Sequence, residues 1–271
     1  MKPPSLQTVA VGDPAQAART IVLLHGFTQS GTSWQPIVPC LQAHGALLVP
    51  DLIGHGRSPA PVEVTPYAME ACVAQVLAVL DAAQVERAWW LGYSMGGRVA
   101  LQVAAHHPER VGGLVLLSAT PGLPGADERT ERRLADEALA QRIEREGVAA
   151  FLDFWMGLPL FAGLQKLPPE ERAALRAARL GNTPVGLANS LRGMGTGAMP
   201  PVWDALSAMD VPTLLLAGMA DAKFTRIAKA MAAQMPQATL RLLEGVGHAL
   251  HLEAQSAVCA ELDAFFAARN G

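Results

Sequence analysis

The chain has 271 residues and a mass of 28.5 kDa, a size that suits a single α/β domain with an insertion. Hydrophobic residues make up 51% of the sequence and charged residues 17%, which excludes a disordered chain. The 24 acidic and 21 basic residues give a net charge of −3, so the chain lacks the basic surface that nucleic-acid binding requires. We therefore expect one folding unit and no nucleic-acid partner.

The cysteines and the N-terminal segment bear on the compartment of the protein. Cys40, Cys72 and Cys259 are odd in number and widely separated, and none belongs to a CxxC pair. We expect neither a disulfide framework nor a thiolate metal site. Residues 1–17 contain no apolar targeting core, and no stretch approaches the ~20 apolar residues of a membrane span. These features predict a cytoplasmic protein with no membrane partner.

Six short apolar runs recur along the chain. Because apolar residues do not alternate with polar ones, such runs are typical of strands buried on both faces. The runs are residues 21–24, 46–49, 88–91, 114–117, 213–217 and 239–243. Helical stretches lie between them, for example at residues 67–82 and 96–106, as in βαβ units. We expect an α/β fold with a doubly wound, mostly parallel sheet, whose strands end at one edge where ligands bind.

The strand pattern stops between the fourth and fifth of these runs. Residues 118–212 have a helical composition with clusters of Glu and Arg and several prolines. Structureless loops of that length are uncommon in compact domains, so we expect a helical cap over the carboxyl edge of the sheet. The expected division is a core of residues 1–117 and 213–271, with a cap of residues 118–212, in one folding unit.

A GxSxG motif contains the first candidate catalytic residue. Gly92-Tyr93-Ser94-Met95-Gly96 directly follows the run at 88–91 and opens a helical stretch. A strand that turns sharply into a helix strains the central residue, and glycines two positions away let the backbones pass while the serine hydroxyl stays exposed. Ser94 is predicted to act as nucleophile or base. The Met95 amide, at the helix N-terminus, is predicted as one donor of an oxyanion hole.

Three further segments follow strands in the same way. His25-Gly26-Phe27 follows the first run, and the Phe27 amide would be the second oxyanion donor, although a strand-end turn with a capping histidine would give the same local pattern. Asp221 follows the run at 213–217, and His248 follows the last run. A serine needs an imidazole to take its proton, and the imidazole needs a carboxylate to fix its tautomer. The order Ser, Asp, His predicts a catalytic triad.

These residues give the chain a resemblance to α/β-hydrolase-fold proteins over residues 21–266. A further signature is the segment Asp51-Leu52-Ile53-Gly54-His55-Gly56-Arg57-Ser58, which in the superfamily makes the turn after an early strand. The resemblance implies little catalytic weight for this segment. The fold alone implies only nucleophilic or base catalysis at an acyl or acidic carbon centre.

Basic residues narrow the expected substrate class. Arg98 lies one helical turn after Ser94, and Lys223 lies two residues after Asp221. Fixed guanidinium groups suit a substrate with carboxylates, which arginine grips through two hydrogen bonds, and they suit a lipid or alkyl ester poorly. Most of the cap arginines should instead pair with interspersed acids in solvent. Nine arginines lie in the cap, at positions 129, 132, 133, 142, 145, 172, 176, 179 and 192.

Several segments carry a closer resemblance. They are residues 131–133, 151–155, 158–161, 186–188, 190–197 and 221–224. They are similar to the 2-succinyl-6-hydroxy-2,4-cyclohexadiene-1-carboxylate synthases of menaquinone biosynthesis, and the similarity covers essentially the whole chain, cap included. It implies a lyase that eliminates pyruvate from 2-succinyl-5-enolpyruvyl-6-hydroxy-3-cyclohexene-1-carboxylate, a small tricarboxylate. The sequence has no metal constellation and no Gly-rich nucleotide loop, so we expect no cofactor and no metal.

The resemblance also implies roles for individual residues. Ser94 would be the general base toward carbon, with its proton passed to His248 oriented by Asp221, and no acyl-enzyme would form. The amides of Phe27 and Met95 would hold the enolate oxygen. Six side chains match the family's pocket, and adjacent arginines make Arg129, Arg133 and Arg192 further candidates. The six are Tyr93, Arg98, Arg132, Trp155, Arg179 and Lys223.

Two local departures from the family are present. Met219 stands where Glu is frequent, and Glu253-Ala254-Gln255 stands where Glu-x-Pro is common. We expect neither departure to touch the triad.

Other functions stay open at the level of sequence. A carboxylesterase or a carbon–carbon bond hydrolase of the same fold would use Ser94 through a covalent acyl intermediate. A binding protein on this fold would use the pocket as a receptor, although the complete set of Ser94, Asp221 and His248 argues against it. Haloalkane dehalogenases and epoxide hydrolases need a carboxylate nucleophile, which Ser94 excludes. The sequence does not determine the oligomeric state.

Overall fold

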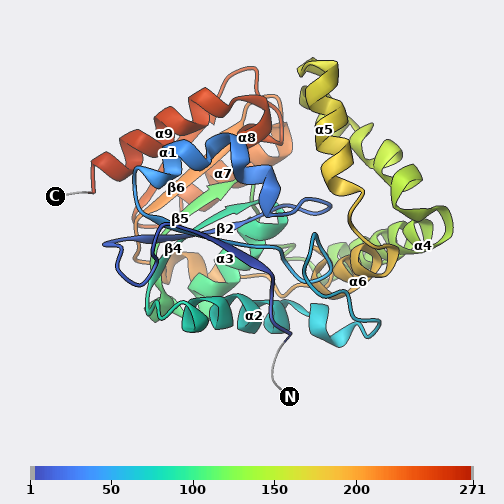
Figure 1. The fold of residues 1–271 in the computed structure, drawn as a ribbon, viewed down its shortest axis with the longest axis horizontal. Helices are drawn as coiled ribbons and strands as arrows, with labels where there is room; N and C mark the ends of the chain where they lie inside the picture. The colour runs from blue at the N-terminus through green and yellow to red at the C-terminus, as the bar shows by residue number, and fades with distance from the viewer. Residues whose placement is uncertain (1–3, 270–271) are drawn as a thin grey trace.

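The computed structural model describes residues 4–269, in which seven strands form one sheet (Figure 1). The strand order is β1-β3-β2-β4-β5-β6-β7. β1 runs antiparallel to β3, and every other neighbouring pair is parallel. The strands are β1 (Thr8–Val11), β2 (Thr20–Leu24), β3 (Ala46–Pro50), β4 (Ala88–Tyr93), β5 (Val111–Leu117), β6 (Thr213–Gly218) and β7 (Ala238–Leu243). The prediction of a mostly parallel α/β sheet is confirmed.

All six apolar runs form strands, whereas β1 was not predicted. β2 and β3 are buried along their whole length because helices cover both faces of the sheet. β1 is a four-residue edge strand that is partly exposed, so it lacks the long apolar run that marked the others. Edge strands of this kind give a weak sequence signal.

Helices cover the two faces of the sheet, as a doubly wound fold requires. Trp90 of β4 belongs to the apolar cluster on one face, and the next residue, Leu91, belongs to the cluster on the other. The first cluster includes residues of α2 (Met69–Ala82), α3 (Met95–His106) and α7 (Ala222–Ala232). The second includes residues of α1 (Val38–Gln42), α8 (Leu250–Glu253) and α9 (Gln255–Ala267). Figure 1 shows α1 and α9 on the side of the sheet opposite to α2.

Residues between β5 and β6, for which we keep the name cap, are helical. The helices α4 (Ala126–Met156), α5 (Pro169–Arg179) and α6 (Pro184–Met194) lie together at one end of the molecule (Figure 1). The 3-10 helices η4 (Pro159–Lys166) and η5 (Trp203–Ala208) complete the segment. α4 bends at Gly147, where φ is 78°. No single helix within residues 4–269 is long and apolar enough to cross a membrane; α4 and η4 pass that test only as a pair bent by 79°.

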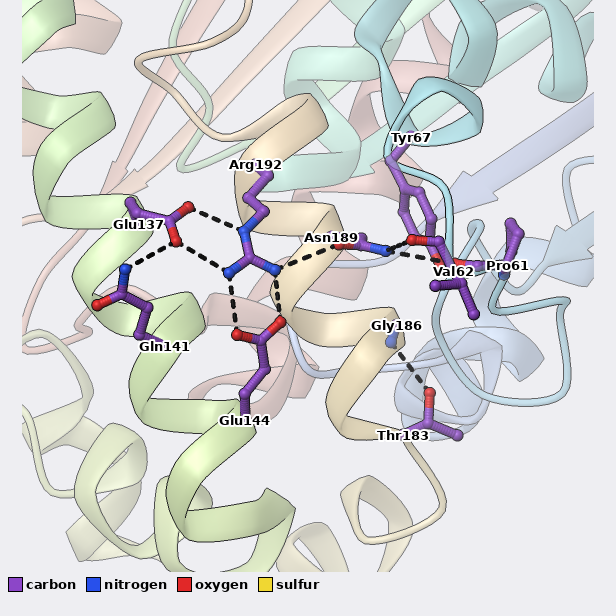
Figure 2. Close-up of polar contacts among 10 residues, drawn as sticks. All are labelled: Pro61, Val62, Tyr67, Glu137, Gln141, Glu144, Thr183, Gly186, Asn189 and Arg192. Carbon is purple, nitrogen blue, oxygen red and sulfur yellow. Dashed lines mark hydrogen bonds and ion pairs between the residues drawn. The ribbon is translucent and has the colours of Figure 1, made fainter.

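Polar contacts join the cap helices to one another and to the core (Figure 2). The Arg192 guanidinium of α6 donates to Glu137 and to Glu144 on α4, in each case through two nitrogens. These bonds hold the pKa of both carboxyl groups below its usual range. The Asn189 amide of α6 donates to the Pro61 carbonyl at 3.3 Å, and so reaches a core loop. α6 is therefore held on two sides.

The expectation of no disulfide is wrong. Cys40 of α1 and Cys259 of α9 form a disulfide across 219 residues of sequence. Sequence spacing did not reveal this pair, because only the folded sheet brings α1 and α9 together on one face. Cys72 is a buried free thiol, and burial raises its pKa to about 12. The cysteines therefore give no support for the predicted cytoplasmic location.

Candidate active site

Ser94 lies at the turn between β4 and α3, in a backbone conformation that glycines make possible. Its φ is 49°, a positive value that costs a non-glycine residue about 1–3 kcal/mol. A Cβ atom on Gly92 would lie 2.5 Å from the carbonyl oxygen of Gly96, and one on Gly96 would lie 2.0 Å from that of Leu24. The turn thus needs glycine at both positions.

The structure brings Ser94, His248 and Asp221 into one hydrogen-bonded chain. His248 Nε2 lies 3.1 Å from Ser94 Oγ, and His248 Nδ1 lies 2.7 Å from Asp221 Oδ2. A carboxylate only accepts, so Nδ1 carries the proton and Nε2 is free to accept the Ser94 proton. The other oxygen of Asp221 accepts from the Phe224 amide at 3.1 Å, which fixes the carboxylate at the start of α7.

Aromatic rings enclose the histidine. The ring centroid of His248 lies 4.5 Å from that of Phe224, 5.3 Å from that of Tyr93 and 5.9 Å from that of Phe161. His248 is only 2% exposed. In such low-dielectric surroundings, charge interactions are stronger than in water.

The two residues predicted to supply oxyanion donors come from the turn after β2 and from the start of α3. Met95 is the first residue of α3, so its amide has no acceptor within the helix. Phe27 lies in the turn after β2, which is closed by a bond of 3.1 Å from the Gln29 amide to the Gly26 carbonyl. Both residues line the same cavity as Ser94. Both residues predicted to supply oxyanion donors therefore lie at the cavity that contains Ser94.

His25 and the segment that begins at Asp51 hold the loops around this cavity. His25 is buried; its Nδ1 donates to the Gly26 carbonyl at 2.9 Å, and its Nε2 accepts from the Leu52 amide at 2.9 Å. The Asp51 carboxylate accepts from the amides of Gly31 at 2.7 Å and Arg57 at 2.9 Å. These contacts connect the turns after β2 and β3.

A cavity of about 420 Å³ lies in front of Ser94 and His248. All six side chains that the family resemblance implied line it, namely Tyr93, Arg98, Arg132, Trp155, Arg179 and Lys223. Asp221 lies behind His248. The cavity wall also includes Gln29, Glu128, Trp203 and Arg226, which sequence reasoning missed. Arg226 could have been found, because residues three apart on a helix share a face with one another and Lys223 was already chosen.

The cavity carries a surplus of positive charge. Arg98 is buried and donates to the Met194 carbonyl; burial and the nearby Arg132 lower its pKa to about 10, so it stays charged at neutral pH. Arg132 pairs with Asp136 at 2.8 Å. Arg179 is 4% exposed, and no acidic side chain within residues 4–269 pairs with it. Burial lowers the pKa of Arg179. A buried, unpaired guanidinium is costly and suits an anionic ligand.

The three further arginine candidates do not line this cavity. Arg129 donates to the carbonyls of Leu123 and Pro124, and Arg133 donates to that of Gly197. Arg192 is held by the two acids of α4 described above. Their side chains serve the structure of the cap.

Comparisons with known proteins identify the family. A family model described as alpha/beta hydrolase fold matches residues 19–255. A 2-succinyl-6-hydroxy-2,4-cyclohexadiene-1-carboxylate synthase of Salmonella paratyphi C is 36% identical over 87% of this chain and 89% of its own length. A relative from Bacillus subtilis, provisionally given the same name, is 39% identical over 90% of this chain and 89% of its own length.

The solved structure of MenH from S. aureus matches with a TM-score of 0.92 and 31% identity, and the match covers 97% of this chain and 99% of that one. The likeness extends over the cap as well as the core, as the family resemblance predicted. The chain therefore belongs to the α/β-hydrolase fold family and, within it, to the family of 2-succinyl-6-hydroxy-2,4-cyclohexadiene-1-carboxylate synthases.

Proposed function

We propose that the protein is a lyase of menaquinone biosynthesis that eliminates pyruvate from 2-succinyl-5-enolpyruvyl-6-hydroxy-3-cyclohexene-1-carboxylate. The names of its relatives support the reaction. The observation that carries the proposal is the unpaired Arg179, which is buried and lines the same cavity as Ser94. A neutral ester could not pair with this buried charge, whereas a carboxylate of the tricarboxylate substrate would neutralise it.

Ser94 begins the reaction as a general base. Its hydroxyl proton passes to His248 Nε2, and the serine oxygen removes the proton from the carbon beside the succinyl ketone. Asp221 stabilises the imidazolium that forms, because its carboxylate already accepts from Nδ1 at 2.7 Å. General base catalysis of this kind contributes about 10²–10⁴-fold, so other groups must supply the remainder.

The amides of Phe27 and Met95 hold the enolate oxygen as negative charge develops on it. Each such donor is worth about 2.7–4 kcal/mol in the transition state. Collapse of the enolate then breaks the bond from the ring to the enolpyruvyl oxygen and forms the diene. The leaving enolate takes the proton from the His248 imidazolium and becomes pyruvate. Ser94, which now holds the proton from carbon, and His248 thereby return to their starting states without a covalent intermediate.

The cavity cations bind and orient the substrate. Arg98 and Arg179 are buried and fixed, whereas Lys223 and Arg226 on α7 are exposed at its wall. These cations bind the carboxylates of the substrate at several points and so hold its acidic carbon near Ser94. Orientation of this kind supplies a large part of the rate enhancement. We assign Tyr93, Arg132 and Trp155 to the same binding surface.

The experiment is to add the purified protein to the enolpyruvyl substrate, made in place by the enzyme that precedes it, and to follow pyruvate. A p-nitrophenyl ester is assayed in parallel. Pyruvate release well above the spontaneous rate, with weak ester cleavage, is the expected result. Background pyruvate release together with a burst of p-nitrophenol would instead identify Ser94 as an acyl nucleophile and refute the proposal.

We also place the reaction in the cytoplasm. Cell fractionation tests this location directly. Alkylation of cell extracts before reduction would show whether Cys40 and Cys259 are bonded to each other in the cell.

A further inference from the structure

Glu253, the last residue of α8, holds the backbone on both sides of His248. Its Oε2 accepts from the Gly247 amide at 2.6 Å, and its Oε1 accepts from the Ala249 amide at 2.9 Å. Both bonds are charge-assisted and therefore stronger than neutral ones. His248 cannot shift along its loop without breaking one of them.

The surrounding backbone fits closely around this carboxylate. A Cβ atom on Gly247 would lie 2.9 Å from Oε2, which is closer than real Cβ atoms approach an oxygen. The Glu253 amide donates in turn to the Ala249 carbonyl at 2.9 Å. Glu253 is thus bonded to the histidine loop through its side chain and its main chain.

The cap approaches the same carboxylate through η4. A Cβ atom on Gly163 of η4 would lie 1.9 Å from Oε2 and 2.3 Å from the carboxyl carbon of Glu253. The same 3-10 helix contributes Leu160 and Phe161 to the cavity wall, and Phe161 also packs against His248. One cap segment therefore touches the cavity, the histidine and the residue that holds the histidine loop.

We propose that Glu253 is a positioning residue for His248, and that the close approach of Gly163 sets the carboxylate in place. Glu253 does not line the cavity, so it acts through the histidine and not on the substrate. The seating of η4 on the core thereby fixes the distance of 3.1 Å between His248 Nε2 and Ser94 Oγ. This inference rests on the proposed role of His248 as the acceptor of the Ser94 proton.

The first test compares two glutamates near His248. Glu253→Gln replaces one accepting oxygen by a nitrogen that cannot accept. The value of kcat for pyruvate release should fall by about 10–100-fold, because a small misplacement of a catalytic group has an effect of this size. KM should stay within about twofold of its normal value. Glu244→Gln is the matched control, because Glu244 is exposed on the loop before His248. It should leave both constants unchanged.

The second test approaches the carboxylate from the cap. Gly163→Ala keeps the charge of Glu253 but displaces its carboxylate, and it should lower kcat in the same way. Gly181→Ala, also in the cap, is the control, because a Cβ there would meet no atom within 4 Å. A normal kcat for Gly163→Ala would overturn the part of the inference that concerns the cap.

A covalent probe separates positioning from folding and from the reaction itself. Diisopropyl fluorophosphate forms a phosphorus–oxygen bond to Ser94 and loses fluoride, while His248 takes the hydroxyl proton. The final extent of labelling measures the fraction of molecules that are folded and active. The labelling rate measures how readily His248 takes the proton from Ser94. Glu253→Gln and Gly163→Ala should reach full labelling at a rate reduced about as much as kcat.

The outcomes distinguish the inference from the proposed function. If the unmodified protein is labelled but releases no pyruvate, the proposed function fails, and the labelling rates still decide the role of Glu253. If Glu253→Gln is labelled and turns over at the unmodified rate, the inference is overturned. If Glu253→Gln shows incomplete labelling, part of that variant is misfolded, and the labelling rate of the folded fraction is compared with that of Gly163→Ala. Slow labelling of both supports the inference, and labelling of both at the unmodified rate overturns it.

Discussion

Replacement of Arg179 by methionine should make the protein more stable and less active. The guanidinium is buried without an acidic partner, and a buried ion carries an effective penalty of several kcal/mol that only a bound anion would offset. Methionine fills a similar volume without charge. We expect the free energy of unfolding without ligand to rise by about 1–2 kcal/mol. The variant also loses a charged hydrogen bond to the substrate, which contributes about 1.5–3 kcal/mol, so KM should rise by about 10–150-fold.

Arg192→Met is the matched control for this prediction. Arg192 is also a cap arginine, but it is held by Glu137 and Glu144 and does not line the cavity. Its replacement should lower the free energy of unfolding by about 1 kcal/mol and leave KM unchanged. Urea unfolding measures the stabilities, and initial rates of pyruvate release give KM. A less stable Arg179→Met variant with normal KM would refute the assignment of Arg179 as a free charge kept for the substrate.

Three further predictions follow from the site and the core. Ser94→Ala should retain the fold and lose nearly all pyruvate release; turnover within tenfold of normal would contradict its role as base. Burial lowers the pKa of His55 and of His251 to about 3, so both are neutral in the fold. The unfolded chain takes up these protons below pH 6.5, so stability should fall as pH drops from 6.5 toward 3, by up to about 1.4 kcal/mol per pH unit for each histidine. Equal urea midpoints at pH 7.5 and 5 would contradict this. Cys40→Ser with Cys259→Ser should cost about 2–4 kcal/mol, whereas a reductant should then have no further effect on the variant's thermal unfolding.

The sheet and the site could be predicted from sequence because both follow from local patterns. A buried parallel strand is a continuous apolar run, and parallel strands place their carboxyl ends together, so residues after β4, β6 and β7 had to be neighbours. This reasoning led to Ser94, Asp221 and His248. Arg98 and Lys223 were chosen from their places beside Ser94 and Asp221. The cap residues of the pocket depended instead on family resemblance, since a cap arginine that faces solvent has the same local sequence as one that faces the cavity.

Three features could not be predicted because they depend on packing between distant segments. The pairing of Cys40 with Cys259 requires α1 and α9 to lie on the same face. The free charge of Arg179 is visible only once every acidic side chain is placed. The role of Glu253 could not be seen from sequence, because its carboxylate holds the amides on both sides of His248 only in the folded loop. Those amides belong to Gly247 and Ala249, and the residue that departs from the family in that segment is Gln255.

The disulfide also has a consequence for a chain that has been cut. Cys40 precedes the cap and Cys259 follows it, so a protease that cleaves once at the bend near Gly147 would leave two fragments joined by a covalent bond. The fragment with Ser94 would stay attached to the one with Asp221 and His248. Such a nicked protein would migrate as one species without reductant and as two with it, and its two halves would refold at an effective concentration that does not fall on dilution.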